Sequence, residues 1–174
     1  MATEIERKFL LRDASWRSAI ERSEPMRQGY LLGAQVRMPA ERALASVRVR
    51  MAGARAWLNV KQAVAGIARA EFEYAIPLAD AQAMLTTLCG GVLQKTRHLV
   101  RVDGTLFEID EFAGDNAGLI VAEVELPAED APFPRPSWLG AEVSTVRRYY
   151  NVSLIDYPYQ QWSAVEQGAG DSTC

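Results

Sequence analysis

The sequence predicts a fold of the α+β class that is mainly β: an eight-stranded antiparallel closed barrel with a charged interior, flanked by a few helices. Three observations carry this prediction. Eight short segments alternate polar and apolar residues and are separated by turn residues, which is typical of antiparallel rather than βαβ folds. Charged residues repeat at alternate positions of these segments, and the intervening rows are mostly apolar. The chain has 174 residues, enough for one domain and too few for two ordinary ones.

The strands follow from this alternation. In the first of them, EIERKFLL, three charged residues share one face and apolar residues occupy the other, with Arg7 as the exception. The second strand, in the segment PMRQGYLLG, is expected to begin after Pro25. The eight strands are predicted at residues 4–11, 26–33, 45–51, 56–62, 68–76, 92–102, 104–112 and 118–126.

Three helical segments are predicted between and after the strands, at residues 13–23, 77–91 and 143–162. The first has a cap signal at Asp13 and Ser15, and the second ends at Gly90–Gly91. A proline-rich acidic loop, PAEDAPFPRP, precedes the third. Four aromatic residues are expected to pack beneath helices: Trp57, Phe72, Phe107 and Trp138.

Composition limits the classes of function. We expect a single domain at residues 1–165 and a flexible tail at 166–174. The net charge of −3 argues against a nucleic-acid-binding protein, which is normally basic. One histidine and two cysteines, Cys89 and Cys174, give neither a zinc site nor a disulfide framework. No signal peptide or membrane-spanning segment is recognisable, so we expect a cytoplasmic protein without a membrane partner.

The charged positions form one continuous pattern. Residues at i and i+2 of a strand lie about 7 Å apart on the same face, so like charges there repel one another. Divalent cations would relieve the carboxylates, and a polyanion would relieve the basic residues. An inward-facing charged row requires the apolar row to face outward, under the helices. The row comprises Glu4, Glu6, Lys8, Arg48, Arg50, Lys61, Arg69, Glu71, Glu73, Lys95, Arg97, Glu108, Asp110, Glu123 and Glu125.

The motif Glu4-x-Glu6-x-Lys8 resembles the signature of the CYTH domain, the fold of the triphosphate tunnel metalloenzymes. Further segments resemble that family in the same order along nearly the whole chain: QGYL, SVRVR, LNVKQ, RAEFEYAIP, KTRHLV, FEIDEFAGDNAGLIVAEVEL and RYYNVSL. Within this family, the chain resembles the short bacterial inorganic triphosphatases. The motif alone is weak, but the ordered set with matching charges is specific.

The resemblance implies that the barrel is a tunnel which binds triphosphate compounds together with Mg²⁺ or Mn²⁺. It assigns the phosphate oxygens to Lys8, Arg48, Arg50, Lys61, Arg69, Lys95 and Arg97. It assigns the metal, directly or through water, to Glu4, Glu6, Glu71, Glu73, Asp110, Glu123 and Glu125. Glu108 is added to the predicted metal ligands because it lies on the same inward row. Glu4, Glu6, Lys8 and Tyr30 are the expected catalytic residues, with Lys8 either orienting water or acting as a base. A homodimer is compatible with the resemblance.

The expected activity is metal-dependent hydrolysis of inorganic triphosphate to pyrophosphate and phosphate. The alternatives are a class IV adenylate cyclase, a thiamine triphosphatase and a polyphosphate-binding module without catalysis. A cyclase must also hold adenine and ribose, whereas Asn59 is the only evident uncharged polar residue on the inward rows. The sequence therefore favours inorganic triphosphate, and it leaves the physiological substrate and the preferred metal open.

Overall fold

The computed structural model describes residues 2–32, 45–62 and 67–168, and most of them belong to strands. The strands are β1 (Ala2–Leu11), β2 (Ile20–Leu32), β3 (Ala45–Ala52), β4 (Arg55–Gln62), β5 (Ala68–Ala75), β6 (Val92–Val102), β7 (Thr105–Phe112), β8 (Ile120–Glu125) and β9 (Leu139–Glu142). The α-helices are α1 (Leu78–Thr87), α2 (Ser153–Asp156) and α3 (Ala164–Gly168). The 3-10 helices are η1 (Ser15–Ala19), η2 (Gly114–Asn116), η3 (Arg147–Tyr149) and η4 (Tyr159–Gln161).

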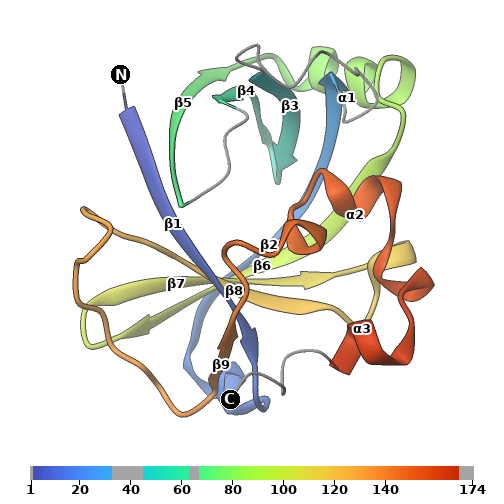
Figure 1. Ribbon diagram of the computed structural model, residues 1–174. Coiled ribbons are helices and arrows are strands. Elements are labelled where there is room, and N and C mark those ends of the chain that lie inside the picture. Colours follow the sequence, from blue (N-terminus) through green and yellow to red (C-terminus); the bar gives the residue numbers. More distant parts are fainter. Residues whose placement is uncertain (1, 33–44, 63–66, 169–174) are drawn as a thin grey trace.

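The strands are antiparallel and follow the order β5-β4-β3-β2-β6-β7-β8-β1-β9 (Figure 1). Strand β1 pairs with β8 and also with β5, the strand at the start of this order. Its residues Ala2 to Ile5 pair with β5, and its residues from Glu6 onward pair with β8. Strand pairing therefore runs around eight strands, and the predicted mainly β barrel is confirmed.

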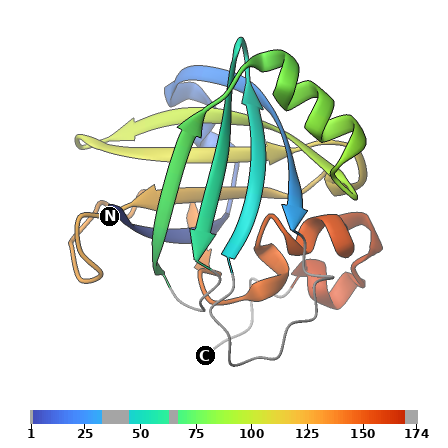
Figure 2. The same cartoon turned by 90° about the horizontal axis from the view of Figure 1, so that it is seen from above.

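The apolar rows face outward, as predicted, and three layers cover them. Helix α1 packs on Val49 and Ala56 of β3 and β4. The C-terminal segment covers a cluster around Leu93 and Val121, and η1 with the 127–138 loop covers another around Phe9 and Phe107. Figure 2 shows α1 on one side of the barrel and the C-terminal helices beside the end of β2. The core thus surrounds the barrel and leaves its interior to the charged rows.

Strand β2 is longer than predicted, because it begins at Ile20 and contains Pro25. Proline cannot donate a ladder hydrogen bond and is unusual inside a central strand. Strand β3 begins to pair with β2 only at Met26, so residues 20–25 of β2 pair with β6 alone. Pro25 is therefore tolerated, because this half of β2 is an edge.

The C-terminal prediction is only partly right. Residues 143–162 form the short helices η3, α2 and η4 instead of one largely helical stretch, and Pro158 stands immediately before η4. Strand β9 was not predicted, since its four residues show little alternation. The predicted end of the domain, residue 165, falls inside α3. Residues 169–174, with Cys174, lie outside the described residues.

Two of the four aromatic predictions are wrong. Trp57 alternates with Asn59 and Lys61, faces the interior side of β4 and lies beneath the guanidinium of Arg50, 5.1 Å from its ring centre. Phe72 is 43% exposed on the outer face. Phe107 and Trp138 are buried against each other, with ring centres 5.2 Å apart.

Within the described residues, no helix is long and apolar enough to cross a membrane.

Candidate active site

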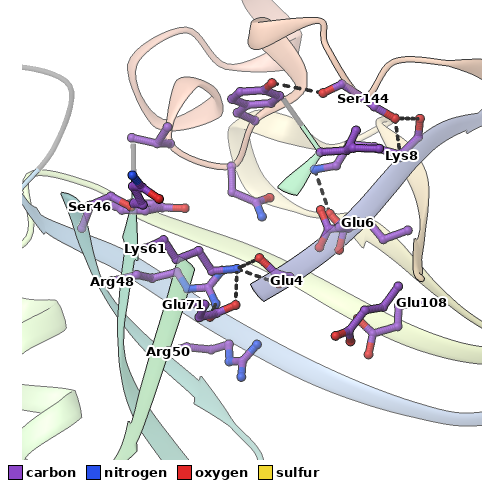
Figure 3. Close-up of a pocket in the computed structure, with 18 of the residues that line it drawn as sticks. Glu4, Glu6, Lys8, Ser46, Arg48, Arg50, Lys61, Glu71, Glu108 and Ser144 are labelled. Atoms are coloured by element: carbon purple, nitrogen blue, oxygen red, sulfur yellow. Dashed lines mark hydrogen bonds and ion pairs between the residues drawn. The ribbon is translucent and has the colours of Figure 1, made fainter. Parts of the chain in front are cut away.

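A cavity of about 690 Å³ occupies the interior of the barrel (Figure 3). Its lining combines charged side chains from the strands with residues of the C-terminal segment. The basic lining residues are Lys8, Arg48, Arg50, Lys61, Lys95, Arg97 and Arg147, and the acidic ones are Glu4, Glu6, Glu71, Glu73, Glu108, Glu123 and Glu125. The uncharged lining residues are Tyr30, Ser46, Gln62, Ile67, Ser144, Tyr150, Asn151 and Val152.

All but two of the predicted site residues line this cavity. Asp110 is fully buried behind the lining, where it pairs with Lys95 and Arg97. The backbone of Arg69 pairs with Glu4 in the β1–β5 ladder, but its side chain lies outside the described residues. The inward alternation of the strands brought the other predicted residues together, although their roles stay predictions.

One side of the cavity, which we call the basic wall, carries Arg48, Arg50 and Lys61 on β3 and β4. Lys61 Nζ lies 2.8 Å from Glu4 Oε2 and 2.9 Å from Glu71 Oε2. Arg50 Nη2 donates to Glu73 Oε2 over 2.6 Å. In Figure 3 these side chains point into one space from neighbouring strands.

Asn59 fixes the two carboxylates of β5 against this basic wall. Its Nδ2 donates to Glu71 Oε1 over 2.9 Å and to Glu73 Oε2 over 2.6 Å, and the residue is fully buried. One amide thereby holds two like charges that stand at i and i+2. Both carboxylates serve as counter-ions of the arginines in this arrangement.

The opposite side, the acidic wall, carries Glu6, Glu108, Glu123 and Glu125 on β1, β7 and β8. Glu6 stands directly opposite Glu125, and Glu108 directly opposite Glu123, in the strand registers. Carboxylates that face each other across neighbouring strands repel one another. The barrel thus concentrates negative charge along these three strands.

Cations compensate only part of the acidic wall. Lys8 Nζ lies 2.7 Å from Glu123 Oε1, and Arg97 Nη2 donates to Glu123 Oε2 over 2.6 Å. Arg97 also binds Asp110 through Nε and Nη2, each over 2.7 Å, and contacts Glu108. The pKa of Glu123 is well below its usual range because Lys8 and Arg97 outweigh the effect of burial.

Within the acidic wall, the pKa values of Glu6 and Glu125 are raised. Burial, followed by the charge of Glu123, raises the pKa of Glu6 to about 7. Burial, followed by the charge of Glu4, also raises the pKa of Glu125. Among the described residues, no three acidic, histidine or cysteine side chains form a ready-made metal cluster. The donor set nevertheless fits a divalent cation, because these are hard oxygen ligands whose repulsion a cation would relieve.

Among the basic residues, the pKa values of Arg50 and Lys95 are lowered. Burial and the neighbouring charge of Arg48 lower the pKa of Arg50. Burial also lowers the pKa of Lys95 to about 8, against the attraction of Asp110 and with the help of repulsion from Arg97. An anion between these side chains would favour their charged forms. The cavity is therefore suited to two ligands of opposite sign, a divalent cation and a polyanion.

Lys8 is held at the end of the cavity nearest the C-terminal segment. Its backbone N–H donates to Ser144 Oγ over 2.9 Å, and its Nζ donates to the carbonyl oxygen of Tyr149 over 3.4 Å. Burial lowers the pKa of Lys8, but the carboxylates of Glu123 and Glu6 raise it by more, so it ends above its usual value. This raised pKa favours the charged form of Lys8, which donates hydrogen bonds.

The lining contributed by the C-terminal segment was missed from the sequence, along with Ser46, Gln62 and Ile67. The RYYNVSL segment carried a signal, since it resembles the family, but no alternation showed where it lies. Gly91 packs against Ile155, a close contact that a Cβ at this position would block at 2.6 Å. This contact seats the segment against the start of β6 and brings Tyr150 and Asn151 to the cavity.

The raised pKa of Glu6 predicts how stability depends on pH. The folded protein binds this proton more tightly than the unfolded chain does, so the contribution of Glu6 falls as pH rises from about 4.5 to about 7. Its full size is about 3–4 kcal/mol, of which about 2 kcal/mol is lost between pH 5.5 and pH 8. Denaturant unfolding in EDTA at pH 5.5 and pH 8 measures it. The Glu6→Gln variant should lose this component and be more stable than the native protein at pH 8; equal pH dependence in both would contradict the assignment.

Comparisons with known proteins agree with this geometry. The family model described as CYTH domain matches residues 2–156. The inorganic triphosphatase of Acetivibrio thermocellus is 38% identical over 163 residues, covering 93% of this chain and 99% of that protein. The inorganic triphosphatase of Nitrosomonas europaea is 36% identical over 155 residues, covering 87% of this chain and 96% of that protein.

A solved structure supports the fold as well. The crystal structure of an inorganic triphosphatase superimposes with a TM-score of 0.62 at 34% sequence identity. The match covers 89% of this chain and 95% of that one.

Proposed function

This chain belongs to the CYTH domain family, and we propose that it is a metal-dependent hydrolase that cleaves inorganic triphosphate to pyrophosphate and phosphate. One observation carries the proposal. The described lining holds seven cationic and seven acidic side chains, so the cavity offers a polyanion no net positive charge of its own. A polyanion enters such a cavity favourably only together with cations, and the crowded acidic wall is a place for them.

The substrate phosphates would lie along the basic side of the cavity. Arg48 and Arg50 present planar donor forks to phosphate oxygens, and Lys61 and Lys95 add compact charges. As the anion binds, it would replace the carboxylates that now pair with these four residues, and those carboxylates could then bind metal ions. Arg97 lies beside the acidic wall, where it bonds to three carboxylates, and it also lines the cavity that would hold the phosphates.

Mg²⁺ or Mn²⁺ would be held by the acidic wall together with Glu4, and Glu6 and Glu125 are the residues whose raised pKa values show the greatest need for a cation. Such an ion neutralises phosphate charge and makes a bound water more acidic. Asp110, behind the lining, is better suited to hold Lys95 and Arg97 than to reach a metal. Glu71 and Glu73 are engaged by Asn59 and the basic wall.

The residues of this chain would act mainly by position and charge. Phosphoryl transfer needs in-line attack and stabilisation of the charge on the transferring and leaving groups. The arginines would supply that stabilisation from fixed positions on the barrel strands β3 and β6. Protonated Lys8 would orient the attacking water or a phosphate oxygen, and Tyr30 is a further residue of the same lining.

The alternative functions find less support in the lining. Adenylate cyclase or thiamine triphosphatase activity requires a surface that grips an aromatic ring, usually by stacking. Among the described lining residues the aromatic ones are Tyr30 and Tyr150, and Tyr150 Oη donates to the Ser144 carbonyl oxygen. A binding module without catalysis would have no use for the acidic wall. The cytoplasmic location and the homodimer stay predictions.

A metal titration tests the proposed function. We expect steady phosphate release from inorganic triphosphate in Mg²⁺ or Mn²⁺, none in EDTA, and full recovery when the metal is returned. Pyrophosphate should accumulate in amounts equal to phosphate. Release at the same rate in EDTA, or no release with either metal, would contradict the proposal.

The basic wall predicts a dependence on anion length. Arg48→Ala should weaken the binding of triphosphate more than that of pyrophosphate, because the longer anion spans more of the cavity. Each lost charge-assisted contact costs about 1.5–3 kcal/mol. Inhibition constants for pyrophosphate and Michaelis constants for triphosphate measure the two effects. Equal losses for both anions would mean that Arg48 does not sense chain length.

A further inference from the structure

Arg147 differs from the other cations that line the cavity. It belongs to η3 and not to a barrel strand, and it is exposed at the end of the cavity that the C-terminal segment forms. The neighbouring Tyr149 provides the carbonyl oxygen that accepts from Lys8 Nζ. Arg147 therefore lies at a mouth of the tunnel, beyond the strand rows.

Among the described residues, no carboxylate pairs with the guanidinium of Arg147. Each of the six strand cations in the lining lies within 4 Å of a carboxylate: Lys8, Arg48, Arg50, Lys61, Lys95 and Arg97. Arg147, by contrast, forms no ion pair or hydrogen bond with any residue in the described part of the chain. An arginine that faces a cavity without a counter-ion is available to an anion.

The residues beside Arg147 offer further polar groups. Asn151 lines the same mouth, and its Oδ1 is buried without a hydrogen-bond partner among the described residues. The oxygen and nitrogen of an asparagine amide exchange places by a half turn, so this side chain can present its NH₂ group instead. Tyr150, Ser46 and Gln62 complete an uncharged polar rim.

The cavity has room for an anion to reach this mouth. At about 30 Å³ for each oxygen, the volume of a water molecule in the liquid, a triphosphate would fill roughly 300 Å³. The cavity measures about 690 Å³. A chain of phosphates can therefore extend from the basic wall toward Arg147 without crowding.

We propose that Arg147 and Asn151 form a phosphate subsite at the C-terminal mouth, which binds one end of the polyphosphate chain. The proposal rests on the proposed function. The carboxylates proposed to hold the metal lie on barrel strands and not on the C-terminal segment, so the subsite would contribute to binding and not to the reacting bond. Arg147 is accordingly a specificity-determining residue that favours anions long enough to reach it.

Arg148 provides a matched control. This neighbouring arginine turns the other way and lies over the rings of Tyr149 and Trp162, at 5.3 Å from each centre. The Arg147→Ala variant should raise the Michaelis constant for triphosphate about tenfold with little change in kcat, a loss that a charge-assisted contact accounts for. Arg147→Lys should recover part of it, and Arg148→Ala should leave the Michaelis constant within about twofold of the native value.

Equilibrium binding separates this inference from the proposed function. Calorimetry with imido-bridged triphosphate and imido-bridged diphosphate, in Mg²⁺, measures binding without turnover. Arg147→Ala should weaken the longer analogue about tenfold and leave the shorter one unchanged. Equal affinity of Arg147→Ala and native protein for the longer analogue, or an equal loss in Arg148→Ala, would overturn the subsite. Failure of the native protein to hydrolyse triphosphate would instead overturn the proposed function, whatever the binding result.

Discussion

Replacing Arg97 by alanine is expected to lower the free energy of unfolding by about 3–5 kcal/mol. The guanidinium bonds to three carboxylates, of which Asp110 is fully buried and Glu123 nearly so. Its removal leaves Asp110 with Lys95 alone, and it takes from Glu123 one of the charges that depress its pKa. Uncompensated buried charge is among the most destabilising changes that a single substitution produces.

Thermal unfolding measures this effect. For a protein of this size, each kcal/mol corresponds to about 2–4 °C in Tm, so a decrease of roughly 6–20 °C is expected. Arg101→Ala is the matched control, because Arg101 lies on the same strand but is half exposed and pairs at the surface with Glu21. A surface pair is worth at most about 1 kcal/mol. Similar Tm values for the two variants would show that Arg97 does not organise the interior.

The second large effect is expected for Glu6→Gln, which should reduce Mg²⁺-dependent turnover of triphosphate by at least about 100-fold. Glu6 faces Glu125 across the strand register, and its pKa of about 7 reflects the crowding that a metal would relieve. The amide keeps the size of the side chain but has no charge to offer a cation. Turnover should fall although the fold is retained or even stabilised.

Glu111→Gln is the control for this substitution. Glu111 follows Asp110 on β7 but faces outward, where it bonds to Arg17 and His98. Its replacement should leave turnover and metal dependence unchanged. Native turnover in Glu6→Gln with an unchanged Mg²⁺ requirement would remove Glu6 from the metal site.

The alternation of charge allowed most of the site to be predicted from the sequence. Glu4, Glu6 and Lys8 share a face because successive side chains of a strand point to opposite sides, and the same rule placed Arg48 with Arg50. Within a strand, the direction of one side chain therefore predicts the direction of the others. Asp110 obeyed the rule but lies behind the lining, because Lys95 and Arg97 cover it.

The parts that could not be predicted lack such a period. Ser144, Arg147 and Asn151 belong to turns and short helices, whose direction depends on packing against the barrel. The four residues of β9 form a strand through pairing with β1 and not through their own pattern. Trp57 shows the converse, since the alternation that placed Lys61 inside also placed this aromatic residue there. Its size and hydrophobicity suggested a covered outer face.

The substrate is the central claim, and phosphorus NMR of the products tests it most directly. Native protein would be incubated with inorganic triphosphate and ATP together, in Mg²⁺ and separately in Mn²⁺ at alkaline pH. We predict that triphosphate disappears first, with a far higher specificity constant, and gives equal amounts of pyrophosphate and phosphate, while any ATP consumed gives phosphate products. Formation of cyclic AMP with stoichiometric pyrophosphate, while triphosphate persists, would contradict the hydrolase.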